Sequence, residues 1–372
     1  MAERKLTVVQ LVPTLETGGV ERGTLEVANA LVSHGHRSIV ISGGGKLVDA
    51  LTVAGSEHVS WPVGRKSLTT LIFVRKLRRF LEQEGVDILH ARSRVPAWIA
   101  WLAWRGMDPA TRPRFVTTVH GLYSVNAYSR IMTRGERVIA VSDTARCYIL
   151  KHYPATDSDR IVTIYRGVDP QAFPRGFRPE PSWLEAWYKQ YPLLRERKVL
   201  TLPGRLTRLK GHEDFIGLMA ALVARGLPVH GLLVGHLDPG RERYTAELRQ
   251  MIRDKGLEDR ITLTGHRSDI REIYSVSDVV LSLSRKPESF GRTVLETLCL
   301  GVPVIGYDHG GVGEVLARLY PEGRVPLGNV DALNEKVTGM LEHPLVVPPV
   351  QRFTLQAMLD ETLALYQSIA RA

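Results

Sequence analysis

Short apolar runs and longer amphipathic segments alternate along the chain. The first set comprises an apolar run at residues 6–12, a turn with Gly18 and Gly19, a helical pattern at 26–32 and an apolar run at 38–42. Short apolar runs predict buried strands, and apolar residues that recur every three to four positions predict helices that cover a sheet. This order predicts βα units with parallel sheets rather than a sandwich or a helical bundle.

The same order begins a second time in the middle of the chain. An apolar run at 199–202 is followed by a turn through Gly204 and Gly211, a helical pattern at 215–223 and another apolar run at 229–234. A chain of 372 residues is longer than a single hydrophobic core usually grows, so two starts predict two domains. Each domain is expected to be Rossmann-like, with a doubly wound α/β sheet.

The segment between the two starts, residues 167–192, contains five prolines, which interrupt regular structure. We therefore place a boundary near residue 178 and predict domains at 1–178 and 179–351. In the last segment, 352–372, apolar residues at helical spacing predict a helix whose apolar face must pack on another surface.

The composition is that of an ordinary globular protein, with 44% hydrophobic and 24% charged residues. The longest apolar stretch, residues 95–104, has about half of the roughly 20 residues that a membrane-spanning helix needs. The first residues lack the cleavage site of an export signal. Two distant cysteines, Cys147 and Cys299, suggest neither a disulfide framework nor a metal-binding motif. A cytoplasmic protein is therefore expected.

The net charge of +10 is concentrated in the first half of the chain. Residues 1–178 contain 25 Lys and Arg against 15 Asp and Glu, whereas the two kinds are equal in number in residues 179–372. Unless the charge serves only solubility, it predicts an anionic partner such as a phospholipid surface or a phosphorylated acceptor. A nucleic-acid partner is not expected, because the sequence has no recognisable nucleic-acid-reading motif.

Residues 65–81 carry six basic residues and no acidic one, with apolar residues at helical spacing. An amphipathic helix with this charge is typical of contact with an anionic membrane surface. A helix whose apolar face covers the sheet of its own domain would show the same spacing. We predict peripheral contact with anionic lipid and keep the structural alternative open.

Two carboxylates separated by seven residues, Glu288 and Glu296, follow an apolar run at 279–283. The turn at 288–291 opens a predicted helix, and backbone N–H groups at a helix N-terminus bind phosphate or sugar oxygens. Glu296 would present acceptor oxygens that suit a vicinal diol such as that of a ribose. Alternatively, Glu288 caps the helix and Glu296 lies on a solvated face.

A second motif, residues 204–211, follows the first strand of the second domain, at the end where open α/β sheets bind ligands. Its Arg205 and Lys210 could converge on a diphosphate, whose charge the protein must neutralise when no metal does so. The spacing is not that of a P-loop. The alternative is two surface charges that share one loop.

The third motif is the pair Gly18 and Gly19 after the first strand, which permits close approach of the backbone to a ligand. It departs from the G-x-G-x-x-G fingerprint. The strand at 38–42 ends in glycines rather than in the acidic residue that a nicotinamide enzyme needs. No cofactor is therefore predicted.

Together the three motifs resemble the retaining glycosyltransferases of family 4, whose GT-B architecture has two Rossmann-like domains facing a central cleft. The resemblance covers nearly the whole chain. It implies that Arg205 and Lys210 bind the diphosphate of a nucleotide-sugar donor. Glu296 would then bind the ribose, and Glu288 the transferred sugar. Further donor contacts are implied for the loop with Gly18 and Gly19, for the amides of Phe290, Gly291 and Arg292, and, near the base, for Gly265, His266 and Arg267.

His120, in the run T-V-H-G after a predicted strand, matches a family histidine near the reacting sugar. A structural histidine at a strand end is the alternative. The candidate catalytic residues are thus His120, Arg205, Lys210 and Glu288.

The resemblance also implies a metal-independent reaction, in which the leaving phosphate takes the proton of the acceptor, and a C-terminal helix at 352–372 that packs on the N-terminal domain. A nucleotide-sugar epimerase of the same architecture and a non-catalytic nucleotide-sugar-binding scaffold are the alternatives.

Two positions depart from the family pattern, because Ser289 replaces a common glycine and Arg292 replaces an aliphatic residue. The base and the hexose of the donor are therefore not fixed by the motifs, and we expect a UDP-sugar. The run at 88–98, with Tyr123 and Asn126 downstream, resembles transferases of the lipopolysaccharide core. The expected acceptor is accordingly a glycan or glycolipid of that core, met at the cytoplasmic face of the inner membrane.

Overall fold

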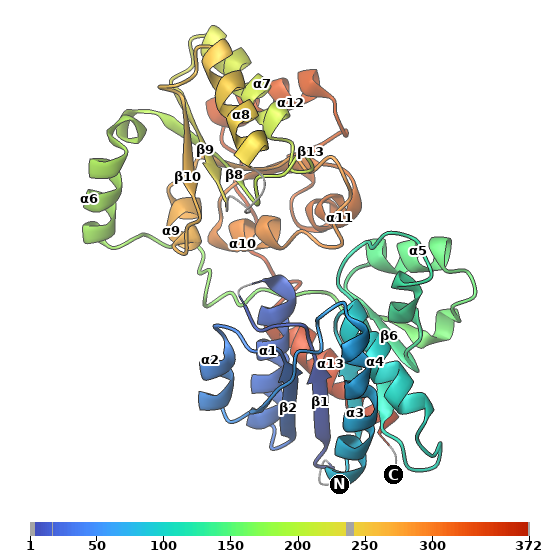
Figure 1. Cartoon of the computed structure of the whole chain (residues 1–372). Coiled ribbons are helices and arrows are strands. Elements are labelled where there is room, and N and C mark those ends of the chain that lie inside the picture. The colour runs from blue at the N-terminus through green and yellow to red at the C-terminus, as the bar shows by residue number, and fades with distance from the viewer. Residues whose placement is uncertain (1–3, 17, 236–241, 371–372) are drawn as a thin grey trace. The chain divides into compact units, whose positions relative to one another are not determined.

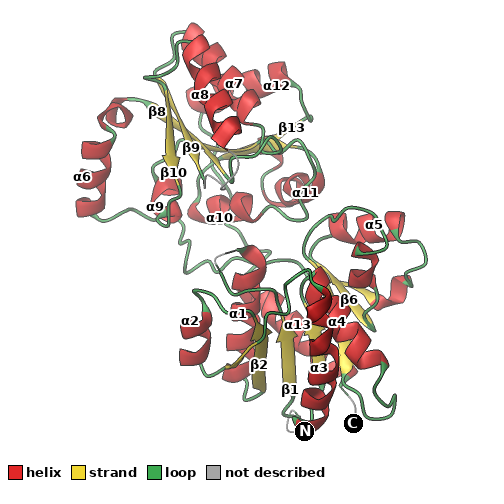
Figure 2. Ribbon diagram, in the orientation of Figure 1, coloured by secondary structure: helices red, strands yellow, loops and turns green. Residues whose placement is uncertain are grey.

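The structure is a computed structural model that describes residues 4–16, 18–235 and 242–370. The chain forms two compact units (Figure 1). Unit 1 comprises Met1–Arg166 together with Gln356–Ala372, and unit 2 comprises Gly167–Leu355. Each unit contains one parallel sheet, and helices lie on both sides of it (Figure 2). The prediction of two Rossmann-like α/β domains is therefore confirmed.

Unit 1 contains a seven-stranded sheet in the order β3-β2-β1-β4-β5-β6-β7, in which all neighbours are parallel. Its strands are β1 (Thr7–Leu11), β2 (Arg37–Ser42), β3 (Glu57–Ser60), β4 (Ile88–Ala91), β5 (Arg114–Val119), β6 (Arg137–Ala140) and β7 (Ile161–Thr163). Its α-helices are α1 (Gly19–Ser33), α2 (Val48–Val53), α3 (Ile72–Gln83), α4 (Arg94–Arg105), α5 (Asp143–His152) and α13 (Leu355–Ile369). Single 3₁₀ turns are η1 (Leu68–Leu71), η2 (Ser129–Thr133) and η3 (Ser158–Arg160).

The inner strands of unit 1 are buried on both faces because helices cover both faces of the sheet. Val9, Ile39 and Leu89 are fully buried examples. The helix α13 completes this unit from the far end of the sequence. Its Tyr366 hydroxyl lies 2.6 Å from Nδ1 of the buried His90, and Arg114 Nε donates to Ile369 O at 2.9 Å.

Unit 2 contains a six-stranded parallel sheet in the order β10-β9-β8-β11-β12-β13. Its strands are β8 (Lys198–Pro203), β9 (Val229–Val234), β10 (Ile261–Gly265), β11 (Val279–Ser282), β12 (Val304–Tyr307) and β13 (Arg324–Val325). Its helices are α6 (Pro181–Gln190), α7 (His212–Ala224), α8 (Glu242–Asp254), α9 (Ile270–Ser275), α10 (Arg292–Leu300), α11 (Gly310–Leu319) and α12 (Val330–Glu342), with 3₁₀ turns η4 (Pro192–Glu196) and η5 (Pro321–Gly323).

The proline-rich segment 167–192 is less irregular than its composition suggests, because it contains α6. Pro181 is the first residue of this helix, a position where proline leaves no hydrogen bond unmade and supplies a helical φ. Trp187 of α6 is buried in a core cluster with residues of the sheet, including Val199 and Leu232. A proline at a helix start thus begins regular structure instead of breaking it.

In both sheets the order of the strands reverses beside the first strand. The reversal lies between β1 and β4 in unit 1 and between β8 and β11 in unit 2. Open α/β sheets bind ligands outside the carboxyl ends of the strands at such a switch point. The topology therefore directs attention to the loops that follow these four strands.

None of the helices in the described parts of the chain is both long enough and apolar enough to cross a membrane.

Candidate functional site

The loops after β8 and β11 meet at the switch point of unit 2 through close backbone packing. Gly211, at the N-terminus of α7, has φ +73°, and a Cβ atom there would lie 2.1 Å from the Leu283 carbonyl oxygen. A Cβ atom on Gly235 would lie 1.8 Å from Gly204 O. Only glycine permits such approaches. The motif at 204–211 is therefore held against the end of β11.

This packing brings two predicted site residues into contact. Lys210 Nζ donates to Glu288 Oε1 at 2.7 Å, and Ser284 Oγ donates to the same carboxylate oxygen. The two charged side chains keep 27% and 28% of their surface exposed. They form an ion pair that is open to solvent and therefore open to exchange with a ligand.

Arg205 lies in the same loop and is exposed. Within the described chain no carboxylate pairs with it, so its guanidinium is available to an anion. Two cations from one loop at the carboxyl edge of the sheet give this site the charge that a diphosphate requires.

The turn after Glu288 is fixed by a second glycine-rich loop. Gly311 N donates to Glu288 O at 2.7 Å, and a Cβ atom on Gly311 would lie 2.3 Å from Phe290 Cα. The helix α10 begins directly after Gly291, without a side-chain cap and without an acidic residue in its first turn. The amides at this helix start therefore carry the partial positive charge that attracts phosphate or sugar oxygens.

Glu296 lies on α10 and is almost completely buried, with 6% of its surface exposed. Arg292 Nε donates to its Oε1 at 2.9 Å, one helical turn away. The two residues thus form an i,i+4 ion pair at the start of the helix. Glu296 is neither on a solvated face nor remote from the other motif residues. Its predicted ribose contact stays a prediction.

The residues predicted to lie near the base follow β10, at the same edge of the sheet. Gly265 ends this strand with φ +73° and accepts a hydrogen bond from Gly235 N at 3.0 Å. The Arg267 guanidinium pairs with Asp269 and lies 5.3 Å from the ring centre of Trp187. His266 stands between them in sequence. The Arg267 side chain is therefore engaged within unit 2.

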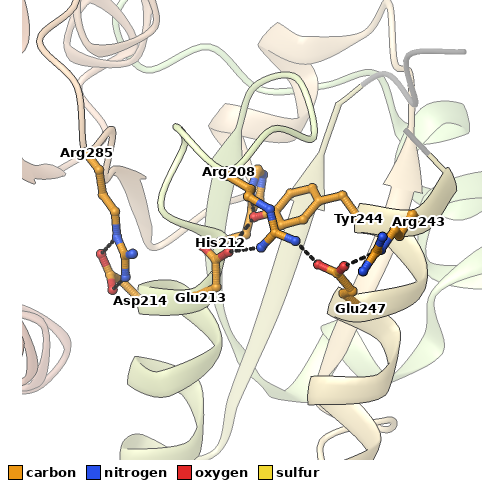
Figure 3. Close-up of polar contacts among 8 residues, drawn as sticks. All are labelled: Arg208, His212, Glu213, Asp214, Arg243, Tyr244, Glu247 and Arg285. Atoms are coloured by element: carbon orange, nitrogen blue, oxygen red, sulfur yellow. Dashed lines mark hydrogen bonds and ion pairs between the residues drawn. The ribbon is translucent and has the colours of Figure 1, made fainter. Parts of the chain in front are cut away.

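Figure 3 shows ionic contacts that join the motif at 204–211 to α8 and to the start of α7. Arg208 pairs with Glu247 of α8 and lies 3.7 Å from Glu213, which also accepts from the Tyr244 hydroxyl at 3.0 Å. Nδ1 of the buried His212 lies 3.3 Å from the same hydroxyl. These contacts fix the start of α7.

A second ionic contact in Figure 3 fixes the segment that leads to Glu288. Arg285 makes a two-pronged contact with Asp214, with Nε to Oδ2 at 3.1 Å, and Tyr307 donates to Oδ2 at 2.8 Å. Sequence reasoning did not identify these residues. No short motif joins positions 71 apart, and only the fold brings them together.

In unit 1 the loop after β1 leads to Gly18 and Gly19 at the start of α1. Arg166 Nη2 donates to Gly19 O at 2.7 Å. Within the described structure, a Cβ atom on Gly19 would meet nothing within 4 Å, whereas one on Gly23 would lie 2.1 Å from Arg166 Nη1. A side chain at Gly23, which the sequence reading did not select, would therefore displace the Arg166 guanidinium.

His120 follows β5 at the same edge of the sheet in unit 1. Burial, together with the nearby Arg92 and Arg166 guanidinium groups, lowers the pKa of His120 well below its usual value. Arg92 itself is 3% exposed and donates to Gln10 Oε1 at 2.8 Å. At neutral pH the His120 imidazole is therefore uncharged, suited to hydrogen bonding and not to charge pairing.

No group of three or more His, Cys, Asp or Glu side chains in residues 4–16, 18–235 and 242–370 is arranged to hold a metal ion. The predicted residues Arg205, Lys210, Gly265, Glu288, Gly291 and Glu296 all lie in unit 2, and Gly18, Gly19 and His120 lie in unit 1.

Two family descriptions match successive parts of the chain. Residues 17–172 match Glycosyltransferase Family 4, and residues 185–357 match Glycosyl transferases group 1. A crystal structure of a glycosyltransferase from Rickettsia africae ESF-5 is 30% identical, covers 98% of both chains and has a TM-score of 0.85. Anabaena HepE, solved with UDP and glucose, shares the fold with a TM-score of 0.82 at 20% identity, over 98% of this chain and 100% of that chain.

Among curated relatives, N-acetyl-alpha-D-glucosaminyl L-malate synthase from Bacillus anthracis is 28% identical over 66% of this chain. The match spans 63% of that relative, which is less than two thirds of its length.

We expect the stability of unit 2 to fall as the pH drops below about 6.5, and His212 to contribute to this fall. Burial lowers the pKa of His212 to about 4, so the unfolded chain binds a proton at a higher pH than the folded chain does. Stability linked to this histidine is present above its unfolded pKa and is lost as the pH falls toward the folded value. At pH 5 the loss is about 2 kcal/mol.

Chemical denaturation of wild type and His212→Asn at pH 7 and pH 5 tests this prediction. The variant should lose about 2 kcal/mol less than wild type between the two pH values. His343→Asn, at an exposed position of the same unit, should behave as wild type does. Equal pH dependence in all three proteins would contradict the prediction.

Proposed function

Because the chain belongs to the glycosyltransferases of family 4, we propose that it transfers a hexose from a nucleoside diphosphate sugar to a glycan or glycolipid acceptor, with retention of anomeric configuration. The observation that carries this proposal is the contact between Lys210 and Glu288 beside Arg205, at the switch point of unit 2. This site combines charge for a diphosphate with a carboxylate for sugar hydroxyls.

In the proposed complex the donor diphosphate replaces Glu288 as the partner of Lys210. The released carboxylate then accepts hydrogen bonds from hydroxyls of the transferred sugar. Arg205 and the amides of Phe290, Gly291 and Arg292 bind the remaining phosphate oxygens. A partly exposed ion pair contributes little to stability, so this exchange costs the protein little.

We assign the ribose to Glu296 and the base to the backbone of Gly265, His266 and Arg267. Arg292 holds one oxygen of the Glu296 carboxylate and so orients it toward the diol. A uridine base is proposed because HepE, which shares the fold, was solved with UDP.

The proposed mechanism requires no nucleophile from the protein. The leaving phosphate takes the proton of the acceptor on the face that it departs from, so the configuration is retained. The chain positions the two substrates and stabilises the phosphate charge that develops in the transition state. His120 enters this scheme as an uncharged imidazole that hydrogen-bonds the reacting sugar.

For the acceptor we propose a glycan or glycolipid of the lipopolysaccharide core, on the basis of the run at 88–98. An epimerase would interconvert nucleotide sugars without an acceptor, and a scaffold would bind the donor without consuming it. Incubation with UDP-hexoses, with and without acceptor, distinguishes these two alternatives from transfer.

Arg205→Ala and Lys210→Ala should each lower turnover by roughly 10² to 10³-fold, the scale of losing one preorganised charge stabiliser. Initial rates of transfer measure this effect. Arg243→Ala is the matched control, because Arg243 is a 94% exposed cation of the same unit and lies outside the proposed site. Rates that match wild type in the Arg205 and Lys210 variants would refute the assignment.

Activity should survive removal of divalent metal, because Arg205 and Lys210 supply the charge that a metal would otherwise bring to the diphosphate. Transfer is measured after dialysis against EDTA. An activity that EDTA abolishes and magnesium or manganese restores would show that the two cations are insufficient.

We also propose that α3 contacts anionic lipid. Arg75, Lys76 and Arg79 are exposed on this helix. Leu71 and Ile72, at its start, expose 52% and 70% of their surface, whereas Leu77 and Leu81 are buried in unit 1. The apolar positions of 65–81 thus divide between the core and the surface. Leu77 and Leu81 therefore pack in the core of unit 1, and we assign the lipid contact to the exposed residues.

Changing Arg75, Lys76 and Arg79 together to Gln should abolish cosedimentation with phosphatidylglycerol vesicles at low salt, since each cation near the surface contributes about 1 kcal/mol. Changing Arg243, Arg249 and Arg253 together to Gln alters the charge of α8 equally and should leave binding intact. Equal binding of wild type to phosphatidylcholine vesicles would remove the electrostatic basis of the proposal.

A further inference from the structure

Unit 1 has an apolar groove at the carboxyl edge of its sheet. The groove has a volume of about 460 Å³, within the range of about 300–1,000 Å³ that is typical of ligand pockets. Its walls include Leu71 from η1, Trp98 and Ile99 from α4, and Tyr128 from the segment before η2.

Contacts within α4, and between α4 and the segment at Tyr128 and Ser129, fix two walls of the groove. Trp98 Nε1 donates to Tyr128 O at 3.0 Å, and the Trp98 ring packs edge-on against Trp101 at 5.6 Å. The Arg94 guanidinium lies 5.2 Å from the ring centre of Tyr128 and donates to Ser129 Oγ at 3.2 Å. The walls formed by α4 and Tyr128 are therefore fixed within unit 1, so a ligand would bind without having to order them.

The rim of the groove is cationic. Arg65 and Lys66 line it, and both are exposed. No carboxylate of the described chain pairs with either side chain, and residues 65–81 contain no acidic residue. The exposed Ile72, next to Leu71 in the sequence, adds apolar surface outside the groove. The groove can thus accommodate hydrocarbon, and its cationic rim can bind an anion.

The groove lies at the same edge of the unit 1 sheet as the candidate catalytic residue His120. Its residues come from the segments that follow β3, β4 and β5, and His120 follows β5 eight residues before Tyr128. In parallel sheets these segments share the carboxyl edge.

We propose that the groove binds the hydrocarbon chain of a lipid-linked acceptor, whose phosphate pairs with Arg65 and Lys66. This proposal rests on the proposed function and specifies the class of its acceptor. Adsorption of α3 to a bilayer surface requires only exposed cations, whereas a groove of this size encloses part of a single chain. The groove therefore selects for chain length, which a surface contact does not.

Calorimetric titration with butyl, octyl and dodecyl phosphate, below their micellar concentrations and without donor, tests the proposal. Each added methylene that enters the groove should tighten binding by up to about fourfold, from a transfer free energy of about 0.8 kcal/mol. Octyl trimethylammonium, with the same chain and the opposite charge, should bind more weakly than octyl phosphate. Equal affinity for butyl and dodecyl phosphate would overturn the proposal.

Matched variants locate the binding. Leu71→Asn should weaken dodecyl phosphate binding by about tenfold, since it places an amide in the groove wall. Val53→Asn makes a polar change of the same kind at an 88% exposed position of α2 and should have no effect. Arg65→Gln with Lys66→Gln should remove the preference for phosphate over trimethylammonium and keep the dependence on chain length. Equal losses in the Leu71 and Val53 variants would assign the binding to another surface.

The outcomes for the groove and for the proposed function are separable, because the titration needs neither donor nor turnover. Alkyl phosphates that bind to a protein without transferase activity would uphold the groove and reject the function. Transfer to a water-soluble acceptor by a protein that ignores alkyl phosphates would reject the groove alone. Each variant should unfold at the same temperature as wild type. This control confirms that folded proteins are compared.

Discussion

Close backbone packing at the carboxyl edge of unit 2 is the constraint on which the candidate donor site depends. The loops after β8, β9, β11 and β12 approach one another so closely that no side chain fits at Gly211, Gly235 or Gly311. This steric requirement places the loops that carry Lys210 and Glu288 next to each other. The charged residues then occupy positions that the main chain has already determined, which is the condition for electrostatic preorganisation.

Two kinds of ion pair serve different purposes around this edge. The Asp214 carboxylate is nearly buried and is held by Arg285 and by Tyr307, so its loss would leave a buried acceptor without partners. The contact between Lys210 and Glu288 is partly solvated and contributes little to the stability of the fold. The first pair supports the loop, whereas the second can open when a ligand offers better partners.

The sequence allowed the alternating elements, the two sheets and the loops that carry the motifs to be predicted, because these features depend on local periodicity and on glycine. It did not reveal the contact of Arg285 with Asp214 or that of His90 with Tyr366, since each joins residues far apart in the chain. It also could not separate the buried Leu77 from the exposed Ile72. Helical spacing identifies an apolar face, but only tertiary packing determines which part of it is covered.

The position of α13 has a consequence for how the protein is made. Unit 2 is one continuous stretch of chain, whereas unit 1 includes a helix that is synthesised only after all of unit 2. Until α13 leaves the ribosome, the buried His90 lacks the hydroxyl of Tyr366 that it contacts. Domains usually complete their folding in the order of synthesis. Here the order is reversed, so unit 2, which carries the candidate donor site, can be completed before unit 1.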